Sequence, residues 1–410
     1  MRRLSVLLLL PVLLGLVSCQ HPPRPAEAGP LILISIDGFR WDYLDRYEAP
    51  TLRGLAANGV HARRLNPVFP SRTFPNHYTL VTGLRPERHG IVHNWFYDPV
   101  QQANFVKSNT ASAWWDQGEP VWITAEKQGM RTACFFWPGS EAEIQGHRPT
   151  LYRKFDGKID SAGRVDGLLA WLDRPAAERP KLGIVYLDVV DIAGHKHGPD
   201  SPEVAAAVRQ ADEAVARLLA GLEKLGLRNS ASFVIVSDHG MSAISPDRVV
   251  FVENLMDASL VTVEATGPHG GVRPKPGVDI AALVASIRAK APPQVRVYGP
   301  DDRPAHLHYG TANPRVPPIL FVMEDGWCLE QKVGWPKLKA MFDRGNHGWD
   351  PTTTPNMGAL FIASGPAFRR GVTLAEADNL DVYNLLCAAL GLAPAANDGS
   401  DKLSRAALRR

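Results

Sequence analysis

The chain has 410 residues, of which 45% are hydrophobic and 21% are charged, so it can bury a substantial core and is not expected to be disordered. This length suits one large domain, or one domain that carries an inserted subdomain. The net charge of +3 is close to neutral and no charge run exceeds a few residues, which excludes a protein that binds nucleic-acid duplexes through a clustered basic face.

Residues 1–19 are typical of an export signal. A basic start precedes an apolar run from Leu4 to Leu16, which is too short for a comfortable membrane span. The run ends in a small residue before Cys19 and resembles the lipobox of bacterial lipoproteins. The resemblance implies a lipid on Cys19 and, since Gln20 follows, a place at the periplasmic face of the outer membrane in the bacterial cell envelope. Residues 20–29 are then a tether; the alternative is an ordinary cleaved signal with a stray cysteine.

Five short apolar runs are typical of strands that are buried on both faces of a parallel sheet. They are Leu31–Ile36, Thr132–Phe136, Leu182–Leu187, Ser232–Val236 and Ala359–Ser364. Three of them lead directly into polar residues, with Asp37 after the first, Asp191 shortly after the third, and Asp238 and His239 after the fourth. Functional groups of open α/β sheets gather at the carboxyl ends of strands. Asp37 taken alone could equally cap the following helix.

Helical patterns alternate with these strands. We expect helices over Thr51–Asn58, Val121–Gln128, Ala162–Leu172, Val204–Leu225 and Leu380–Leu390. The fourth is the clearest, because its apolar residues fall on one stripe with charges opposite. The alternation predicts an α/β fold with a mostly parallel central sheet and helices on both faces. The segment from Trp95 to Gly118 lacks periodicity and is expected to be a long loop at the rim of a substrate site.

The character of the chain changes between about residues 245 and 344. Ile280–Ala289 is a helix candidate, and Val295–Tyr298 and Ile319–Met323 are strand candidates. Pro268–Gly277 is rich in proline and glycine and is expected to be a loop. We therefore predict a small α+β insertion within one catalytic domain that covers residues 30–410.

Thr73 lies where a helix can begin. Phe74 and Pro75 follow it, proline is well tolerated in a first helical turn, and Gly83 is a good helix stop. Thr73 is therefore expected to be the N-cap, next to free N–H groups that favour anions. A plain capping threonine is the alternative.

The aspartates and histidines form a set that suits divalent metal ions. Asp37, Asp191 and Asp238 are joined by His239, by His195 four residues after Asp191, and by His347 in a glycine-rich loop. Two ions need about this many oxygen and nitrogen ligands. His197 competes with His195 as a ligand, and scattered caps and surface histidines are the alternative reading.

A thiolate metal site is not expected. Beyond Cys19, the chain has only Cys134, Cys328 and Cys387, without a CxxC pattern. In an exported protein two of these could form a disulfide, and the sequence leaves the pair open.

Six sequence blocks resemble the nucleotide pyrophosphatase/phosphodiesterase family of the alkaline phosphatase superfamily. They are Ser35–Arg40, Pro70–Tyr78, Gly83–Asn94, Asp191–Pro199, Ser237–Met241 and Asn346–Gly348, in the order that the family has them. The resemblance implies an alkaline-phosphatase-like sheet and hydrolysis of nucleotide phosphodiester and pyrophosphate bonds, with release of nucleoside 5′-monophosphates.

The same resemblance implies two Zn²⁺ per chain and a role for each site residue. Asp191, His195 and His347 match the ligands of one zinc. Asp37, Asp238 and His239 match those of the other, which also holds the hydroxyl of the nucleophile Thr73. Asn94 and the N–H of Phe74 would hold a phosphoryl oxygen. Phe74 and Tyr186 would sandwich the base, with Phe155 as a further wall.

Three other functions remain open at this stage. The metal site could serve a phosphomonoesterase, or a diesterase acting on phospholipid head groups. From another class, the chain could be a surface lipoprotein that binds metal or ligand without turnover. Phe74, Tyr186 and Asn94 favour nucleotides over the first two, because flat aromatic faces suit a base.

Overall fold

The computed structural model describes residues 29–409, so the predictions for the signal, Cys19 and most of the tether lie outside the described residues. Its centre is a nine-stranded sheet with the strand order β18-β2-β17-β8-β1-β7-β5-β6, in which β19 pairs with β2. The strands are β1 (Leu31–Ile36), β2 (Val60–Asn66), β5 (Thr132–Phe135), β6 (Leu151–Arg153), β7 (Leu182–Leu187), β8 (Ser232–Val236), β17 (Ala359–Ser364), β18 (Val372–Leu374) and β19 (Ala377–Asp378). Strands β8, β1, β7, β5 and β6 run parallel, whereas β17 is antiparallel to both β8 and β2. The predicted α/β fold with a mostly parallel sheet is confirmed.

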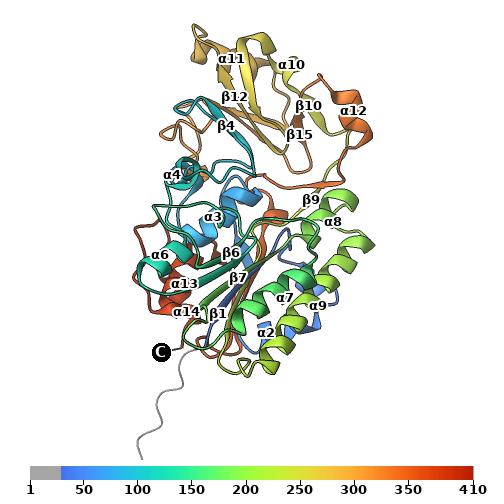
Figure 1. Cartoon of the computed structure of the whole chain (residues 1–410). Coiled ribbons are helices and arrows are strands. Elements are labelled where there is room, and N and C mark those ends of the chain that lie inside the picture. The colour runs from blue at the N-terminus through green and yellow to red at the C-terminus, as the bar shows by residue number, and fades with distance from the viewer. Residues whose placement is uncertain (1–28, 410) are drawn as a thin grey trace, which may run out of the picture.

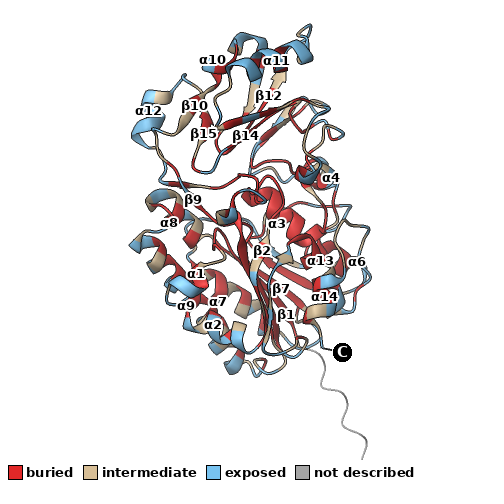
Figure 2. Cartoon of the chain, turned by 180° about the vertical axis from the view of Figure 1, so that it is seen from behind, coloured by how far each residue is buried: buried red, intermediate tan, exposed pale blue. Residues whose placement is uncertain are grey.

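Helices cover both faces of this sheet (Figure 1). One face carries α2 (Pro50–Ala57), α7 (Ser161–Leu172) and α9 (Pro202–Lys224), and the other carries α3 (Thr73–Thr82), α6 (Val121–Lys127), α13 (Leu380–Leu390) and α14 (Lys402–Ala407). In β1, Leu31 and Leu33 pack into one hydrophobic cluster while Ile32 and Ile34 pack into the other. The apolar run is continuous because alternate side chains pack against the helices on opposite faces of the sheet. Figure 2 shows the buried residues concentrated in this sheet and on the inner sides of the helices.

A second, smaller sheet lies beyond the carboxyl ends of the central strands, in the upper part of Figure 1. It has the antiparallel order β11-β12-β14-β13, and a parallel pair, β10 with β15, packs beside it. The elements are β10 (Val249–Phe251), α10 (Val252–Leu255), β11 (Val261–Ala265), β12 (His269–Pro274), α11 (Ile280–Lys290), β13 (Val295–Tyr298), β14 (Ile319–Met323), β15 (Cys328–Glu330) and α12 (Trp335–Ala340). A separate hydrophobic cluster fills it. The expected loop over Pro268–Gly277 is wrong, since His269–Pro274 is an interior strand.

The expected loop over Trp95–Gly118 is also partly wrong. It contains a hairpin, β3 (Phe96–Asp98) and β4 (Ala103–Phe105), and the short helix α5 (Ser112–Trp115). Arg315, from the smaller sheet's long loop, is buried against this segment and donates to Asp98 Oδ2 at 2.7 Å. The hairpin is therefore fixed to both parts of the molecule.

Two further points concern the described residues 29–409. Cys134, Cys328 and Cys387 are all buried and free, so no pair of them forms the disulfide that the sequence left open. No helix in this range has both the length and the apolar character that a membrane crossing requires.

Candidate active site

Thr73 is the first residue of α3 rather than its N-cap. Arg72 takes the N-cap position with an extended backbone (φ −110°, ψ 154°), and no side chain caps the helix. The Thr73 hydroxyl instead lies 3.3 Å from Nε2 of His239. The N–H of Phe74 donates to Oδ1 of Asn94 at 2.8 Å. Gly83 ends the helix in the left-handed region, as predicted.

Asp37, Asp238 and His239 meet beside Thr73. They follow β1 and β8, which are adjacent parallel strands, so their carboxyl ends lie side by side. His239 Nε2 lies 2.9 Å from Asp238 Oδ2 and 3.4 Å from Asp37 Oδ1. All three side chains are buried. A metal ion held by these three side chains would lie next to the Thr73 hydroxyl, because His239 is close to both.

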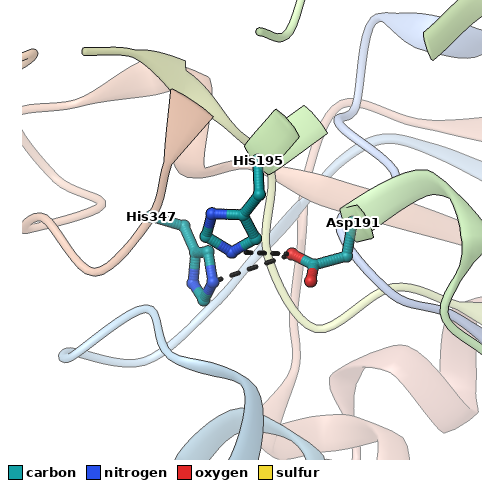
Figure 3. A group of neighbouring side chains, drawn as sticks. All are labelled: Asp191, His195 and His347. Carbon is teal, nitrogen blue, oxygen red and sulfur yellow. Dashed lines mark ion pairs between the residues drawn. The ribbon is translucent and has the colours of Figure 1, made fainter. Parts of the chain in front are cut away.

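Asp191, His195 and His347 form the adjoining group (Figure 3). Asp191 and His195 lie on α8 (Val189–His197), and their spacing of four puts both on one helix face. His195 Nε2 is 3.5 Å and His347 Nε2 is 3.7 Å from Asp191 Oδ1. His197 lies outside this group and pairs instead with Glu203 Oε1 at 3.6 Å.

The two groups form one continuous cluster. The rings of His239 and His347 stack with their centroids 3.4 Å apart, and one ligand atom each of Asp37, Asp191 and His239 lie within 4.8 Å of one another. All six predicted ligands are thus brought together. The structure adds His77, whose Nδ1 is 3.2 Å from Asp238 Oδ2. The sequence analysis missed it, although its place one turn after the start of α3 puts it on the face of Thr73.

The electrostatics of the cluster favour a bound cation. Burial and the neighbouring Asp238 and Asp191 carboxylates raise the pKa of Asp37 well above its usual value. Burial and the adjacent imidazoles of His239 and His195 lower the pKa of His347 well below its usual value, so its ring is a neutral donor.

Three buried carboxylate oxygens of the cluster also lack a hydrogen-bond donor, one each on Asp37, Asp191 and Asp238. Buried polar atoms normally have partners. Divalent cations would satisfy these oxygens and offset the crowded negative charge. Oxygen and imidazole donors without sulfur suit zinc and related metals.

An aromatic pocket of about 430 Å³ opens beside Thr73. We use this name for the hollow lined by Thr73, Phe74, Lys107, Phe155 and Tyr186 with their neighbours. Phe155 is 55% exposed, so its ring is available to a ligand. Tyr186 differs, because its hydroxyl donates to Asp37 Oδ2 at 2.5 Å and ties the ring to the carboxylate cluster. Phe155 is consequently the freest aromatic wall, since Phe74 is buried against Phe105 and Trp115.

Comparison with known proteins identifies the family. The profile described as type I phosphodiesterase/nucleotide pyrophosphatase matches residues 31–350. The chain belongs to this family. The match includes every candidate site residue described above. The protein is therefore a hydrolase of the nucleotide pyrophosphatase/phosphodiesterase type.

Several relatives of this phosphodiesterase are known. An uncharacterized pyrophosphatase/phosphodiesterase of Schizosaccharomyces pombe is 39% identical over 90% of this chain and 78% of its own length. Venom phosphodiesterase CdcPDE of Crotalus durissus collilineatus is 37% identical over 92% of this chain and 46% of its own length. Mouse ectonucleotide pyrophosphatase/phosphodiesterase family member 1 is 37% identical over 93% of this chain and 43% of its own length. This phosphodiesterase thus spans less than half of the latter two relatives.

Solved structures show the same fold. Murine ectonucleotide pyrophosphatase/phosphodiesterase 5 superposes with a TM-score of 0.85 at 32% identity, covering 92% of this chain and 100% of that chain. A second structure of that murine protein, an inactive variant with a threonine-to-alanine substitution in complex with AMP, has the same TM-score of 0.85.

Proposed function

We propose that this chain is a two-zinc phosphodiesterase that hydrolyses nucleotide phosphodiester and pyrophosphate bonds and releases nucleoside 5′-monophosphates. The observation that carries the proposal is the position of the Thr73 hydroxyl, between the cluster of Asp and His side chains and the aromatic pocket. A reacting phosphorus at Thr73 would have metal ligands on one side and Phe74 and Phe155 on the other. The AMP bound by the murine relative supports a nucleotide as the ligand.

Thr73 is the nucleophile of this mechanism. Two divalent cations, held by the six Asp and His side chains, would supply the Lewis acidity that makes an ionised threonine hydroxyl accessible at neutral pH. Thr73 Oγ1 attacks phosphorus and forms a phospho-threonine ester, while the bond to the leaving oxygen breaks and that oxygen keeps the electron pair. Water then hydrolyses the ester and restores the Thr73 hydroxyl. The nucleoside 5′-monophosphate leaves from the aromatic pocket.

Asn94 holds the transferred phosphoryl group. Its Oδ1 already accepts the N–H of Phe74, which fixes the plane of the side-chain amide. Its Nδ2 is then the donor for a non-bridging phosphoryl oxygen, where charge builds up in the transition state. The sequence analysis also expected the Phe74 N–H to contact the phosphoryl group. In the structure this N–H donates to Asn94 Oδ1 instead.

A substrate panel tests the function. Wild type should hydrolyse the nitrophenyl ester of thymidine 5′-monophosphate in large preference to nitrophenyl phosphate, because only the diester fills the aromatic pocket. Thr73→Ala should abolish both activities, while Thr73→Ser should retain part because the hydroxyl remains. A preference for the monoester would instead favour a phosphomonoesterase, and hydrolysis of phospholipid head groups alone would favour the lipid diesterase. Absence of all phosphoesterase activity in metal-loaded protein would favour a binding lipoprotein.

The proposed location is the periplasmic face of a bacterial outer membrane, through a lipid on Cys19. It rests on the sequence of residues 1–19. The described chain is compatible with it, because β1 starts at Leu31 and Asp37 follows the opposite end of this strand. Labelled palmitate should enter the wild-type protein expressed in a bacterial host, and Cys19→Ser should not be labelled. Equal labelling of both would refute the lipid anchor.

A further inference from the structure

Arg164 contacts the walls of the aromatic pocket without being one of its lining residues. It is the fourth residue of α7, and it is only 2% exposed. Four residues that do line the pocket lie against its guanidinium, namely Phe136, Phe155, Tyr186 and Asp188. The guanidinium is therefore on the far side of these walls from a ligand. The proposed mechanism gives it no part.

Hydrogen bonds fix the position of this guanidinium. Its Nη1 donates to the carbonyl of Tyr186 at 3.0 Å, and its Nη2 donates to Asp188 Oδ2 at 2.9 Å. Its Nε donates to the carbonyl of Ile159, just before the start of α7, at 2.8 Å. The planar fork of an arginine can make these bonds and still offer its face to aromatic rings. Arg164 is thus held in place by the start of α7 and by the end of β7.

Three aromatic rings of the pocket lie close to this fixed cation. The Cζ atom of Arg164 is 5.3 Å from the ring centroid of Phe136, 5.7 Å from that of Phe155 and 5.8 Å from that of Tyr186. A cation within about 6 Å of a ring centroid is attracted by the ring, more strongly where water is excluded. The three rings come from neighbouring strands, since Phe136 follows β5, Phe155 comes shortly after β6, and Tyr186 lies in β7. One buried side chain thus connects wall segments of three strands.

Among these rings, Phe155 depends most on Arg164. Tyr186 is also fixed by the hydrogen bond from its hydroxyl to Asp37, and Phe136 is buried. Phe155 instead lies in the loop between β6 and α7, and its side chain is exposed. Its ring also contacts the ring of Phe136, with centroids 5.1 Å apart. Without Arg164 the Phe155 ring would be less ordered, and a ligand that orders it on binding would lose affinity.

We propose that Arg164 is a positioning residue, which holds Phe155 and the adjoining walls of the aromatic pocket in the arrangement that binds the base of a nucleotide. The inference rests on the proposed function, because it concerns how the same site selects a nucleoside. It gives Arg164 no contact with the substrate and no part in the chemical step. Substitution of Arg164 should therefore weaken the contribution of the base and leave the reaction at phosphorus unchanged.

Two phosphodiesters with the same leaving group provide the test. One is the nitrophenyl ester of thymidine 5′-monophosphate, and the other is methyl nitrophenyl phosphate, in which a methyl group replaces the nucleoside. The test compares kcat and KM for both in wild type, Arg164→Met and Arg164→Lys. The matched control is Arg179→Met, because Arg179 also donates to carbonyls, those of Leu172 and Arg174 at the end of α7, and does not line the aromatic pocket.

Arg164→Met should lower the preference for the nucleoside ester over the methyl ester, expressed as a ratio of kcat/KM values, by about tenfold. The loss should appear as a higher KM for the nucleoside ester with kcat unchanged, because the base is bound equally before and during the reaction. Arg164→Lys should lose less, since lysine keeps the charge without the planar fork. Arg179→Met should keep the preference. Both substrates are measured in one preparation, so the amount of folded enzyme cancels from the ratio.

A double substitution tests whether Arg164 acts through Phe155. Phe155→Ala should itself lower the preference, and the addition of Arg164→Met should lower it little further, since the ring that Arg164 holds is already absent. Losses that multiply in the double variant would overturn the inference. So would equal losses on both esters in Arg164→Met, or an unchanged preference in both Arg164 variants, while the proposed function stands in each case. A wild type that does not cleave the thymidine ester would overturn both proposals.

Discussion

Replacing Arg315 by methionine should destabilise the protein more than any surface charge substitution. The guanidinium is 2% exposed and donates to four groups, namely Asp98 Oδ2 at 2.7 Å and the carbonyls of Gly90, Trp114 and Ala113 at 3.0, 2.9 and 2.8 Å. Methionine has a similar apolar stem and retains none of these bonds. The Asp98 carboxylate and three carbonyls would lose their donor.

The expected loss follows from this geometry. Removal of one partner from a buried ion pair costs about 3–5 kcal/mol, because the remaining charge is left uncompensated. Asp98 keeps hydrogen bonds from the N–H groups of Val100 and Gln101, which offset part of this cost. We therefore expect Arg315→Met to lower the free energy of unfolding by about 3 kcal/mol.

Urea unfolding followed by tryptophan fluorescence measures this loss, and two further variants make the reasoning specific. Asp98→Asn combined with Arg315→Met removes the uncompensated charge, so the double variant should be more stable than the sum of the single effects by about 1 kcal/mol or more. Arg405→Met is the matched control, since Arg405 is 67% exposed where it pairs with Asp401, and it should change stability by less than about 1 kcal/mol.

Two results would refute this reasoning. One is an Arg315→Met protein whose stability lies within about 1 kcal/mol of wild type, since a buried charge would then have been left unpaired at no cost. The other is strict additivity in the double variant, which would mean that Asp98 and Arg315 do not act on each other.

Three further predictions concern other groups. Burial raises the pKa of Glu330 to about 7, although Arg72 opposes this, so the folded state holds this proton in a pH range where the unfolded chain releases it. Wild-type stability should therefore fall by about 2 kcal/mol more than that of Glu330→Gln between pH 4.5 and 7.5, and parallel pH profiles would contradict this. Removal of metal by a chelator should lower the melting temperature, because Asp37 and Asp238 lose the cation that offsets their charges; an unchanged value in protein shown metal-free by elemental analysis would argue against a bound cation. Tyr186→Phe should weaken metal affinity about 10- to 100-fold in a chelator competition, since it removes the donor to Asp37, and an unaltered affinity would exclude this role.

The strands of the central sheet were the easiest elements to predict. The bounds of β1, β7, β8 and β17 agree with the apolar runs in the sequence. Such strands are covered by helices on both sides, so most of their side chains are apolar. The same logic locates Asp37 and Asp238, because polar residues that end such a run lie at one edge of the sheet.

Strand β12 was predicted as a loop for a physical reason. Its glycines are typical of a loop, but they permit close packing inside the smaller sheet. A Cβ on Gly270 would lie 2.3 Å from Leu329, and one on Gly271 would lie 2.3 Å from Pro317. The close packing leaves no room for side chains at Gly270 and Gly271, so the alternating pattern that indicates a strand is missing from the sequence.

The candidate site was only partly accessible from local sequence. Asp191 and His195 could be paired by their spacing of four residues after a buried strand, but His347 was connected to them only through the family resemblance, because the contact is long-range. His77 was missed because nothing in its own segment indicates that Asp238 lies 3.2 Å away. Contacts between distant segments leave no periodic signal.

The cluster of Asp and His side chains draws on distant parts of the described chain, from Asp37 directly after the first strand to His347 directly after β16 (Gly345–Asn346). A nascent polypeptide that emerges in order cannot complete the cluster until almost all of it has been synthesised. Chains interrupted within the smaller sheet would still contain Thr73, yet they would lack His347, one of the candidate metal ligands. A chain interrupted before His347 therefore cannot assemble the complete cluster.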